Sequence, residues 1–438
     1  MLDTDIPLQR AYVLHPRTQG TGHLADYELE EALGLTEALE LVATGGEVVP
    51  LREVRANTYL AGGKIEEIKA HVAAHDIDVV VINASLSPIQ QRNLERALNC
   101  KVIDRQGLIL EIFALRAATK EGRLQVELAR QAYERSRLVR TWTHLERQRG
   151  GQGFLGGPGE RQIESDRRQL DERITRLRRQ LDKVRQTRSL QRQKRERAPE
   201  RIVALVGYTN AGKSTLFNKL TEGGVLAKDM LFATLDTTLR VLPLPNGKPA
   251  LLSDTVGFIS NLPTDLIAAF QATLEEVKLA DLLVHVRDIA DPLTEERRED
   301  VLEVLDQIGA GPAHDQPTLE VWNKADLLPV ERLADLRDIA DAQSGPDATP
   351  AYLVSAQTGQ GLDDLRNGIE THLSLDDRTL LVTIAPTDYA ARAWLFENGD
   401  VLQEAAGQGG VSEMTVRLSD VDAGKFRQRF AGVETQTA

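Results

Sequence analysis

The stretch RIVALVGYTNAGKST, from Arg201 to Thr215, decides the fold of the central part of this chain. It combines a buried apolar strand, a glycine loop with the spacing G-x4-G-K-S and the start of a helix. Successive backbone amides of such a loop, together with the helix N-terminus, can hold the α- and β-phosphates of a nucleotide. Lys213 would reach the β- and γ-phosphates, and the Ser214 hydroxyl would bind Mg²⁺. The sequence therefore predicts a nucleoside triphosphate site.

Two shorter segments downstream, FATLD (Phe232 to Asp236) and DTVG (Asp254 to Gly257), predict a sensor of the γ-phosphate. DTVG closes an expected strand, ALLSDT, so Asp254 can hold Mg²⁺ through water and the Gly257 amide can touch the γ-phosphate. Thr234 lies in the loop between the phosphate motif and DTVG, where its hydroxyl and backbone can complete the Mg²⁺ shell. A loop that is ordered by metal and γ-phosphate, and released after hydrolysis, is a switch.

The segment NKAD (Asn323 to Asp326), after the expected strand TLEVWN, predicts guanine as the base. Asp326 can accept two parallel hydrogen bonds from guanine, a pair that adenine cannot offer, and Asn323 can meet the other edge of the purine. Lys324 would cover the base with its alkyl chain. The segment SAQ (Ser355 to Gln357) would add a backbone amide to the guanine O6.

These motifs define the expected site. Three residues are expected to take part in hydrolysis, namely Lys213, Thr234 and Gly257, and two are expected to bind Mg²⁺ directly, namely Ser214 and Thr234. The residues expected to contact nucleotide are Gly207, Tyr208, Thr209, Asn210, Ala211, Gly212, Lys213, Ser214, Phe232, Ala233, Thr234, Leu235, Asp236, Asp254, Thr255, Val256, Gly257, Asn323, Lys324, Ala325, Asp326, Ser355, Ala356 and Gln357.

Regular structure is expected on both sides of the nucleotide motifs. Residues 1 to about 118 alternate short apolar strands, such as DVVVIN at Asp78 to Asn83, with helices such as Tyr27 to Ala43, which predicts a small parallel α/β layer. The block from Arg201 to about Leu373 predicts a doubly wound parallel sheet. After Leu375 two apolar strands flank a helical stretch, so a compact α+β unit is expected there.

An arginine-rich segment precedes the phosphate motif. Apolar residues recur at helical spacing, first at Leu124, Leu128, Leu138, Trp142 and Leu145. After a break they recur as heptads at Ile163, Leu170, Ile174, Leu177, Leu181 and Val184. The break between them, Gly150 to Glu160, is rich in glycine and cannot remain helical. The pattern predicts an antiparallel helical hairpin with a flexible tip loop.

Composition limits the class of protein. The chain has 438 residues and a net charge of −13, yet residues 121 to 200 hold 21 Lys and Arg against 12 Asp and Glu, a local charge of +9. One basic element on an acidic body suits a protein that meets phosphates only there, although a solvated helix pair has the same composition. No long apolar run predicts a spanning helix, so we expect a cytosolic protein. The lone Cys100 carries no expected chemistry.

The five nucleotide motifs, together with LSPIQQRNLE (Leu86 to Glu95) and GGQGFLGGPGERQIESDRR (Gly150 to Arg168), resemble the HflX family, within the translation-factor branch of P-loop GTPases. The resemblance implies a cytoplasmic GTPase that hydrolyses GTP to GDP with Mg²⁺. It also implies binding to the large (50S) ribosomal subunit, with the arm near the peptidyl-transferase region of 23S rRNA, and splitting or rescue of stalled ribosomes under stress. We expect a monomer. We expect an N-terminal α/β domain (1–118), a helical hairpin (119–200), a GTPase domain (201–374) and a C-terminal α+β domain (375–438).

Three features modify that expectation. Family members commonly have Thr where this chain has Arg161, and Phe154 and Leu155 replace more polar residues at the tip. Phe258 stands where many GTPases have a water-positioning glutamine, so intrinsic hydrolysis is expected to be slow. The missing positioning or charge must come from a partner, another switch residue or a cation, and the large ribosomal subunit is the natural supplier. Asn210 matches a position linked to K⁺ use in some related GTPases, and the alternative is that it only braces the loop.

Other functions stay open at the level of sequence. The GTPase can instead time ribosome assembly or dormancy, with the arm acting as a binding module. The N-terminal layer can instead drive ATP-dependent RNA remodelling, although it has no second full phosphate loop. AGGK (Ala61 to Lys64) can bind a phosphate through backbone amides ahead of a helix, but an ordinary loop and helix start is the favoured interpretation. A membrane-remodelling role is disfavoured because no amphipathic anchor is evident.

Overall fold

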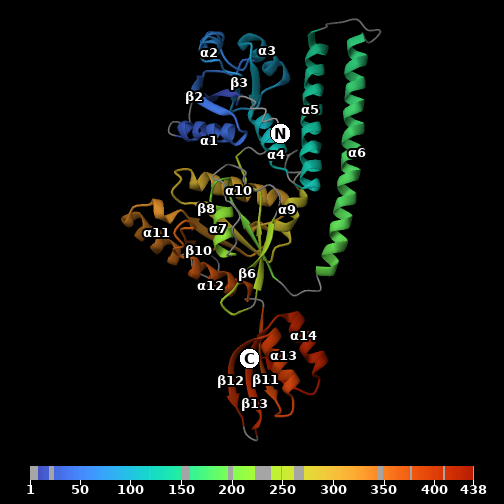
Figure 1. Cartoon of the computed structure of the whole chain (residues 1–438), viewed down its shortest axis with the longest axis vertical. Coiled ribbons are helices and arrows are strands. Elements are labelled where there is room, and N and C mark those ends of the chain that lie inside the picture. The colour runs from blue at the N-terminus through green and yellow to red at the C-terminus, as the bar shows by residue number, and fades with distance from the viewer. Residues whose placement is uncertain are drawn as a thin grey trace, which may run out of the picture.

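The computed structural model consists of three β-sheets and a long helical hairpin, which we call the arm (Figure 1). It describes residues 8–18, 24–117, 119–148, 158–195, 201–221, 238–247, 249–260, 271–342, 349–374, 377–407 and 410–437. The expected boundaries after residues 118, 200 and 374 stay predictions. The expected fold class, a P-loop GTPase fold joined to an N-terminal α/β unit, the arm and a smaller C-terminal α+β unit, is confirmed.

The N-terminal sheet has four parallel strands in the order β2-β1-β3-β4. All four positions of β3 are buried, as an inner strand of a covered parallel sheet requires. The helix expected over Tyr27 to Ala43 is shorter: it ends at Ala38, because Glu40 adopts a left-handed φ of 61° and β2 begins at Val42. The elements are β1 (Arg10–Thr18), α1 (Ala25–Ala38), β2 (Val42–Leu51), α2 (Gly62–His75), β3 (Val79–Ile82), α3 (Pro88–Leu98), β4 (Lys101–Asp104) and α4 (Arg105–Arg116).

The arm consists of α5 (Lys120–Gln148) and α6 (Pro158–Arg195), which run side by side in opposite directions (Figure 1). Ion pairs join the helices, from Arg135 to Asp171 at 2.8 Å and from Arg173 to Glu127 at 3.4 Å. Three of the expected apolar positions on α6 are buried, namely Ile174, Leu177 and Leu181. On α5 the buried apolar positions are Val126 and Ala129, whereas the expected Leu124 and Leu128 are half-buried.

The buried positions of α5 differ from the expected ones because this helix also packs against the N-terminal unit. Val126 and Ala129 belong to the same apolar cluster as α1 and α4, and the Tyr133 hydroxyl donates a hydrogen bond to Asp104 at 2.7 Å. The side chains of residues 138–164 and 185–195 lie outside the described part of the arm, and so does the whole of 149–157. The expectations for Trp142, Phe154, Leu155 and Arg161 therefore stay predictions.

The central sheet has six strands in the order β10-β9-β8-β5-β7-β6. Five are parallel as expected, but β6 is an antiparallel edge strand that the sequence patterns did not predict. Helices cover both faces, which is the doubly wound arrangement (Figure 1). The elements are β5 (Ile202–Val206), α7 (Lys213–Leu220), β6 (Thr238–Pro243), β7 (Pro249–Asp254), α9 (Gln271–Lys278), β8 (Leu282–Asp288), α10 (Thr294–Ile308), η1 (Pro312–His314), β9 (Thr318–Asn323), η2 (Ala325–Leu327), α11 (Val330–Ala342), β10 (Ala351–Leu353) and α12 (Leu362–Leu373).

One apolar cluster continues from the N-terminal unit into the central unit. It joins Ala32 and Leu35 of α1 to Tyr208, Phe258 and Ile259 beside the central sheet. Burial of this surface stabilises the contact between the two units. The N-terminal unit therefore lies directly against the loops that carry the nucleotide motifs.

The C-terminal unit is an antiparallel sheet in the order β12-β13-β11-β14, with two helices packed on it. The expected β11, α13 and β13 are present, and β12, α14 and β14 are additional. Its elements are β11 (Arg378–Ile384), α13 (Tyr389–Asn398), β12 (Asp400–Ala406), β13 (Ser412–Leu418), α14 (Asp420–Arg429) and β14 (Glu434–Thr437). Among the described residues, no helix is long and apolar enough to cross a bilayer.

Candidate nucleotide-binding site

The phosphate-binding loop, Gly207 to Ser214, joins β5 to the first turn of α7, as the motif predicted. Gly207 has a φ of 150°, and a Cβ there would lie 2.2 Å from the carbonyl oxygen of Val286. Gly212 has a φ of 91°, and its Cβ would lie 2.2 Å from Nδ2 of Asn323. Both positions require glycine, because any side chain would clash and force the loop open. The loop thus brings its backbone amides to the N-terminus of α7, where anions bind.

Lys213 is buried at the base of this loop, with 6% of its surface exposed. Its ammonium group donates hydrogen bonds to the carbonyl oxygens of Gly207 at 3.0 Å and Tyr208 at 2.6 Å. Burial lowers the pKa of Lys213 to about 8, and the nearby Asp254 carboxylate opposes this shift only in part. Phosphate oxygens would favour the charged ammonium, so the group suits an anionic ligand.

Ser214 and Asp254 lie together beside the lysine. The Ser214 hydroxyl donates a hydrogen bond to Oδ2 of Asp254 at 2.8 Å. The parallel pairing of β5 with β7 produces this contact, since it aligns Leu205 with Asp254 at the carboxyl edge of the sheet. A hydroxyl and a carboxylate are hard oxygen donors, which fit Mg²⁺. Among the described residues there is no cluster of three or more His, Cys, Asp or Glu that could hold a metal ion.

The DTVG segment lies directly against the phosphate-binding loop. The Thr209 amide donates to the carbonyl oxygen of Phe258 at 2.7 Å, and the Phe258 amide donates to that of Gly207 at 3.1 Å. A Cβ at Gly257 would approach Thr209 Cγ2 to 2.8 Å and Lys213 Nζ to 3.1 Å. Glycine is therefore needed next to the lysine that would hold the γ-phosphate.

Phe258, at the position where other GTPases have glutamine, is 3% exposed and lies in the apolar cluster shared with the N-terminal unit. Its side chain is buried among apolar groups and is not available to orient water. The expectation that Phe258 leaves the hydrolytic machinery incomplete stays a prediction.

The NKAD segment follows β9, and its asparagine has a second task that the sequence did not predict. Asn323 donates from Nδ2 to the carbonyl oxygen of Ala211 at 2.8 Å and accepts at Oδ1 from the Ala356 amide at 3.0 Å. It therefore ties the phosphate-binding loop to the SAQ loop. Lys324 forms an ion pair with Asp288 at 2.7 Å, and Asp326 is exposed at the start of η2.

Four of the five nucleotide motifs lie within the described residues. The structure brings the phosphate-binding loop, the DTVG segment, NKAD and SAQ to one edge of the central sheet, through β5, β7, β9 and β10. The five residues Phe232, Ala233, Thr234, Leu235 and Asp236 lie outside the described residues. The assignment of individual nucleotide and metal contacts stays a prediction.

Lys64 and Cys100 lie in the N-terminal unit, outside the nucleotide motifs. Lys64 of the AGGK pattern forms ion pairs with Glu47 at 2.6 Å and Glu67 at 2.8 Å, so its charge is already neutralised. Cys100 is half-buried before β4, and burial raises the pKa of its thiol to about 11, which disfavours the reactive thiolate.

Comparison with known proteins identifies the family. Models described as "GTP-binding GTPase N-terminal", "GTP-binding GTPase Middle Region" and "50S ribosome-binding GTPase" match residues 26–114, 116–195 and 202–324. GTPase HflX of Escherichia coli is 43% identical over 399 residues, which cover 91% of this chain and 90% of the relative. The chain belongs to the HflX family of GTPases. GTPase HflX of Magnetococcus marinus is 54% identical over 333 residues, covering 76% of this chain and 74% of the relative.

A solved structure supports the same fold. The crystal structure of a complex of SsGBP and GDP has 26% sequence identity and a TM-score of 0.50, and the likeness covers 83% of this chain and 98% of that chain. This HflX-family chain is therefore a GTP-binding GTPase of a ribosome-associated family, which confirms the expected nucleotide and enzyme class.

One contact at the site was not anticipated at all. Tyr208, the second residue of the phosphate-binding loop, extends away from the lysine and places its hydroxyl 2.7 Å from the Glu31 carboxylate of α1. No local pattern signals this contact, because the two residues are 177 positions apart.

Proposed function

We propose that this chain binds the large (50S) ribosomal subunit in the cytoplasm and uses GTP to split or rescue stalled ribosomes under stress. It acts as a monomer, with the arm directed at 23S rRNA near the peptidyl-transferase region. Family membership and the match of residues 202–324 to a model described as a 50S ribosome-binding GTPase support the choice of partner. The observation that carries the proposal is the exposed arginine surface of the arm.

That surface lies on the outer side of α6. Arg176 and Arg179 are exposed, and within the described residues no carboxylate lies within ion-pairing distance of them. Arginine guanidinium groups bind phosphate oxygens through parallel hydrogen bonds, so an unneutralised row of them suits the backbone of RNA. The same helix buries Ile174, Leu177 and Leu181 against α5, which keeps the arginines on the outer face.

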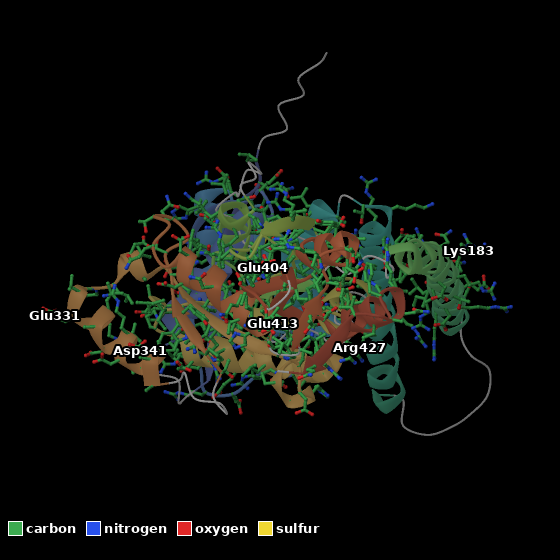
Figure 2. The ribbon with its side chains drawn as sticks, turned by 90° about the horizontal axis from the view of Figure 1, so that it is seen from below. Lys183, Glu331, Asp341, Glu404, Glu413 and Arg427 are labelled. Atoms are coloured by element: carbon green, nitrogen blue, oxygen red, sulfur yellow. The ribbon has the colours of Figure 1, made fainter. Side chains whose placement is uncertain are left out.

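Charge is also separated across the molecule. Lys183 of α6 lies on the opposite side of the structure from the acidic Glu331 and Asp341 of α11 (Figure 2). Residues 121–200 carry +9, and the rest of the chain carries −22. An RNA surface repels the acidic body and attracts the arm, which orients the protein as it approaches.

At the nucleotide site each residue has a proposed role. Lys213 neutralises the β- and γ-phosphates, and Asp326 selects guanine. Ser214 and Thr234 would hold Mg²⁺ directly, and Asp254 would hold it through water. Bound Mg²⁺ supplies positive charge that stabilises the developing charge on the transferred phosphoryl group. Because the Phe258 side chain is buried, the group that positions the attacking water comes from the ribosome. A contribution of K⁺ through Asn210, which is exposed with a φ of 61°, stays a prediction.

Cosedimentation of the full chain with 30S, 50S and 70S particles tests the partner. We expect the chain to pellet with 50S and 70S particles in a nonhydrolysable GTP analogue and to remain in the supernatant in GDP. GTP turnover should rise at least about tenfold when 50S subunits are added. Ribosome binding that is the same in GDP and in the GTP analogue would contradict the proposal. GTP turnover that is already fast without ribosomes would contradict it too.

A paired set of variants tests the arm. Arg176→Glu/Arg179→Glu should abolish binding to 50S subunits and the splitting of 70S ribosomes, measured by light scattering. The control Arg332→Glu/Arg337→Glu changes the same charge on the exposed face of α11 and should retain both. A wild-type chain that binds 50S subunits but leaves 70S ribosomes intact would favour a timing role in assembly or dormancy over splitting.

A further inference from the structure

Tyr208 joins the phosphate-binding loop to two other parts of the molecule. Its hydroxyl lies 2.7 Å from Oε2 of Glu31 on α1 and 2.6 Å from Oγ of Ser260, and it accepts a hydrogen bond from the Ser260 amide at 2.9 Å. The tyrosine is 5% exposed. A single phenol thus contacts the N-terminal unit and the chain just after DTVG.

Ser260 is held from several sides. Besides the tyrosine, its hydroxyl donates to Asp300 of α10 at 2.6 Å, and its carbonyl oxygen accepts from Arg105 of α4 at 3.2 Å. Arg105 also pairs with Glu31 at 2.6 Å. The position of Ser260 therefore depends on the central unit and on the docked N-terminal unit together.

Glu31 is the residue on which these contacts converge. Its side chain is 10% exposed, and Arg297 of α10 lies 3.8 Å from it while stacking 4.7 Å above the centre of the Tyr208 ring. A buried carboxylate between two arginines and a phenol is well satisfied, whereas either partner left alone would be costly. Glu31 consequently fixes how α1 lies against the phosphate-binding loop.

The hydrogen bonds in this cluster can run in more than one direction. Tyr208 and Ser260 each have one hydroxyl proton, but three oxygen contacts need one, namely Tyr208 with Glu31, Tyr208 with Ser260, and Ser260 with Asp300. Two protons cannot serve three contacts at once. The tyrosine can therefore exchange its bond to Glu31 for one to Ser260 without moving its ring.

Ser260 is only three residues after Gly257, the proposed γ-phosphate contact. Between them, Phe258 is bonded through its backbone to Gly207 and Thr209. The chain from Gly257 to Ser260 is thus restrained at both ends before any ligand arrives. A restrained amide loses less conformational entropy when it binds, and only GTP, not GDP, has the γ-phosphate that would use it.

We propose that Glu31, Tyr208 and Ser260 are positioning residues through which the docked N-terminal unit favours GTP over GDP at the nucleotide site. The inference rests on the proposed role of the Gly257 amide. By linkage, bound GTP must in turn strengthen the docking of α1 by the same factor. The N-terminal unit is then part of the nucleotide sensor.

The test compares two affinities on the full chain. Dissociation constants for GDP and for a nonhydrolysable GTP analogue are measured by fluorescence for wild type, Glu31→Gln and Tyr208→Phe. We expect both variants to weaken the GTP analogue relative to GDP by roughly fivefold or more. Glu30→Gln, an exposed neighbour on α1, is the control and should leave the ratio unchanged. An unchanged ratio of the two affinities in Glu31→Gln would overturn the inference. If both affinities fall equally, the ratio is also unchanged, and the role of Glu31 is merely structural.

Two further measurements separate this inference from the proposed function. The double variant Glu31→Gln/Tyr208→Phe should shift the ratio by less than the sum of the two single variants, because both lose the shared contact; fully additive shifts would contradict that. Gly257→Ala alone should weaken binding of the GTP analogue relative to binding of GDP. If it does so while Glu31→Gln leaves the ratio intact, the proposed γ-phosphate contact stands and the coupling to α1 is wrong.

Discussion

Asn323 contacts Ala211 across 112 positions of sequence, through a hydrogen bond of 2.8 Å from its side-chain amide to the backbone carbonyl oxygen. The other end of the same amide accepts from the Ala356 backbone at 3.0 Å. The base-selecting segment and the phosphate-binding loop therefore share one buried side chain. Removing it should disturb both.

We expect Asn323→Ala to lower the free energy of unfolding by about 3 kcal/mol, because two buried backbone groups lose their partners. GDP affinity should fall together with stability, since the phosphate-binding loop loses its brace. Urea denaturation and GDP titration measure the two effects. Asn367→Ala, on the exposed face of α12, is the matched control and should change neither. A stable Asn323→Ala protein with normal GDP affinity would refute the bracing role.

The buried Lys213 predicts a pH dependence of nucleotide binding. Burial lowers its pKa to about 8, so the free protein loses the ammonium charge as the pH rises through that value. Phosphates bind the charged form, and GDP affinity should therefore fall as the pH rises above about 8. Binding at pH 8 should also take up protons, which calorimetry in two buffers with different ionisation enthalpies detects.

The same shift has a consequence for stability without nucleotide. Because the pKa of Lys213 is lower in the fold than in the unfolded chain, the folded state favours the neutral amine. The resulting contribution to the free energy of unfolding is fully present above the unfolded pKa, and it is lost as the pH falls through the folded pKa of about 8. Lys213→Met should consequently be more stable than wild type near pH 7, and the difference should shrink by pH 10. Comparison of urea denaturation at the two pH values checks this sign.

The contact of Ser214 with Asp254 predicts that metal removal loosens the nucleotide. Chelation of Mg²⁺ should accelerate GDP release from the wild-type protein by at least about tenfold, because the cation links these side chains to the phosphates. Excess Mg²⁺ should restore slow release. Ser214→Ala should release GDP quickly with or without chelator. Wild-type release that ignores the chelator would mean that the pair does not hold a metal.

Much of the fold could be predicted because its signals are local. The apolar run IVALV of β5, followed by two required glycines and Lys213, specifies strand, loop and helix within a dozen residues. β6 was missed because only Leu242 in it is fully buried, so its sequence has neither an apolar run nor a clean alternation. The early end of α1 depends on the left-handed conformation of Glu40, which glutamate rarely adopts and no propensity predicts.

The sequence predicted the parts of the site in which a single segment faces the ligand. It did not predict the contacts between segments that are far apart in the sequence. The motifs indicated which loops meet at the sheet edge, since the carboxyl ends of parallel strands lie together. The contact of Tyr208 with Glu31 depends instead on how two separately folded layers dock, and it leaves no mark on either segment alone. A tyrosine in a glycine loop, with a bulky side chain that the phosphates do not need, is the only signal that could have drawn attention to it.

The burial of Phe258 makes a final prediction about hydrolysis. We expect Phe258→Gln to lower the free energy of unfolding by about 3 kcal/mol, because it places an amide in an apolar cluster. GTP turnover without ribosomes should nevertheless stay slow, since both backbone hydrogen bonds of residue 258 go to the phosphate-binding loop and keep its side chain directed into the cluster. Phe258→Leu, which keeps the site apolar, should cost about 1 kcal/mol with the same turnover. A tenfold gain in single-turnover rate for Phe258→Gln would show that the side chain can swing to the nucleotide. Without that gain, the contacts that hold the loop also exclude residue 258 from catalysis, and another group must position the water.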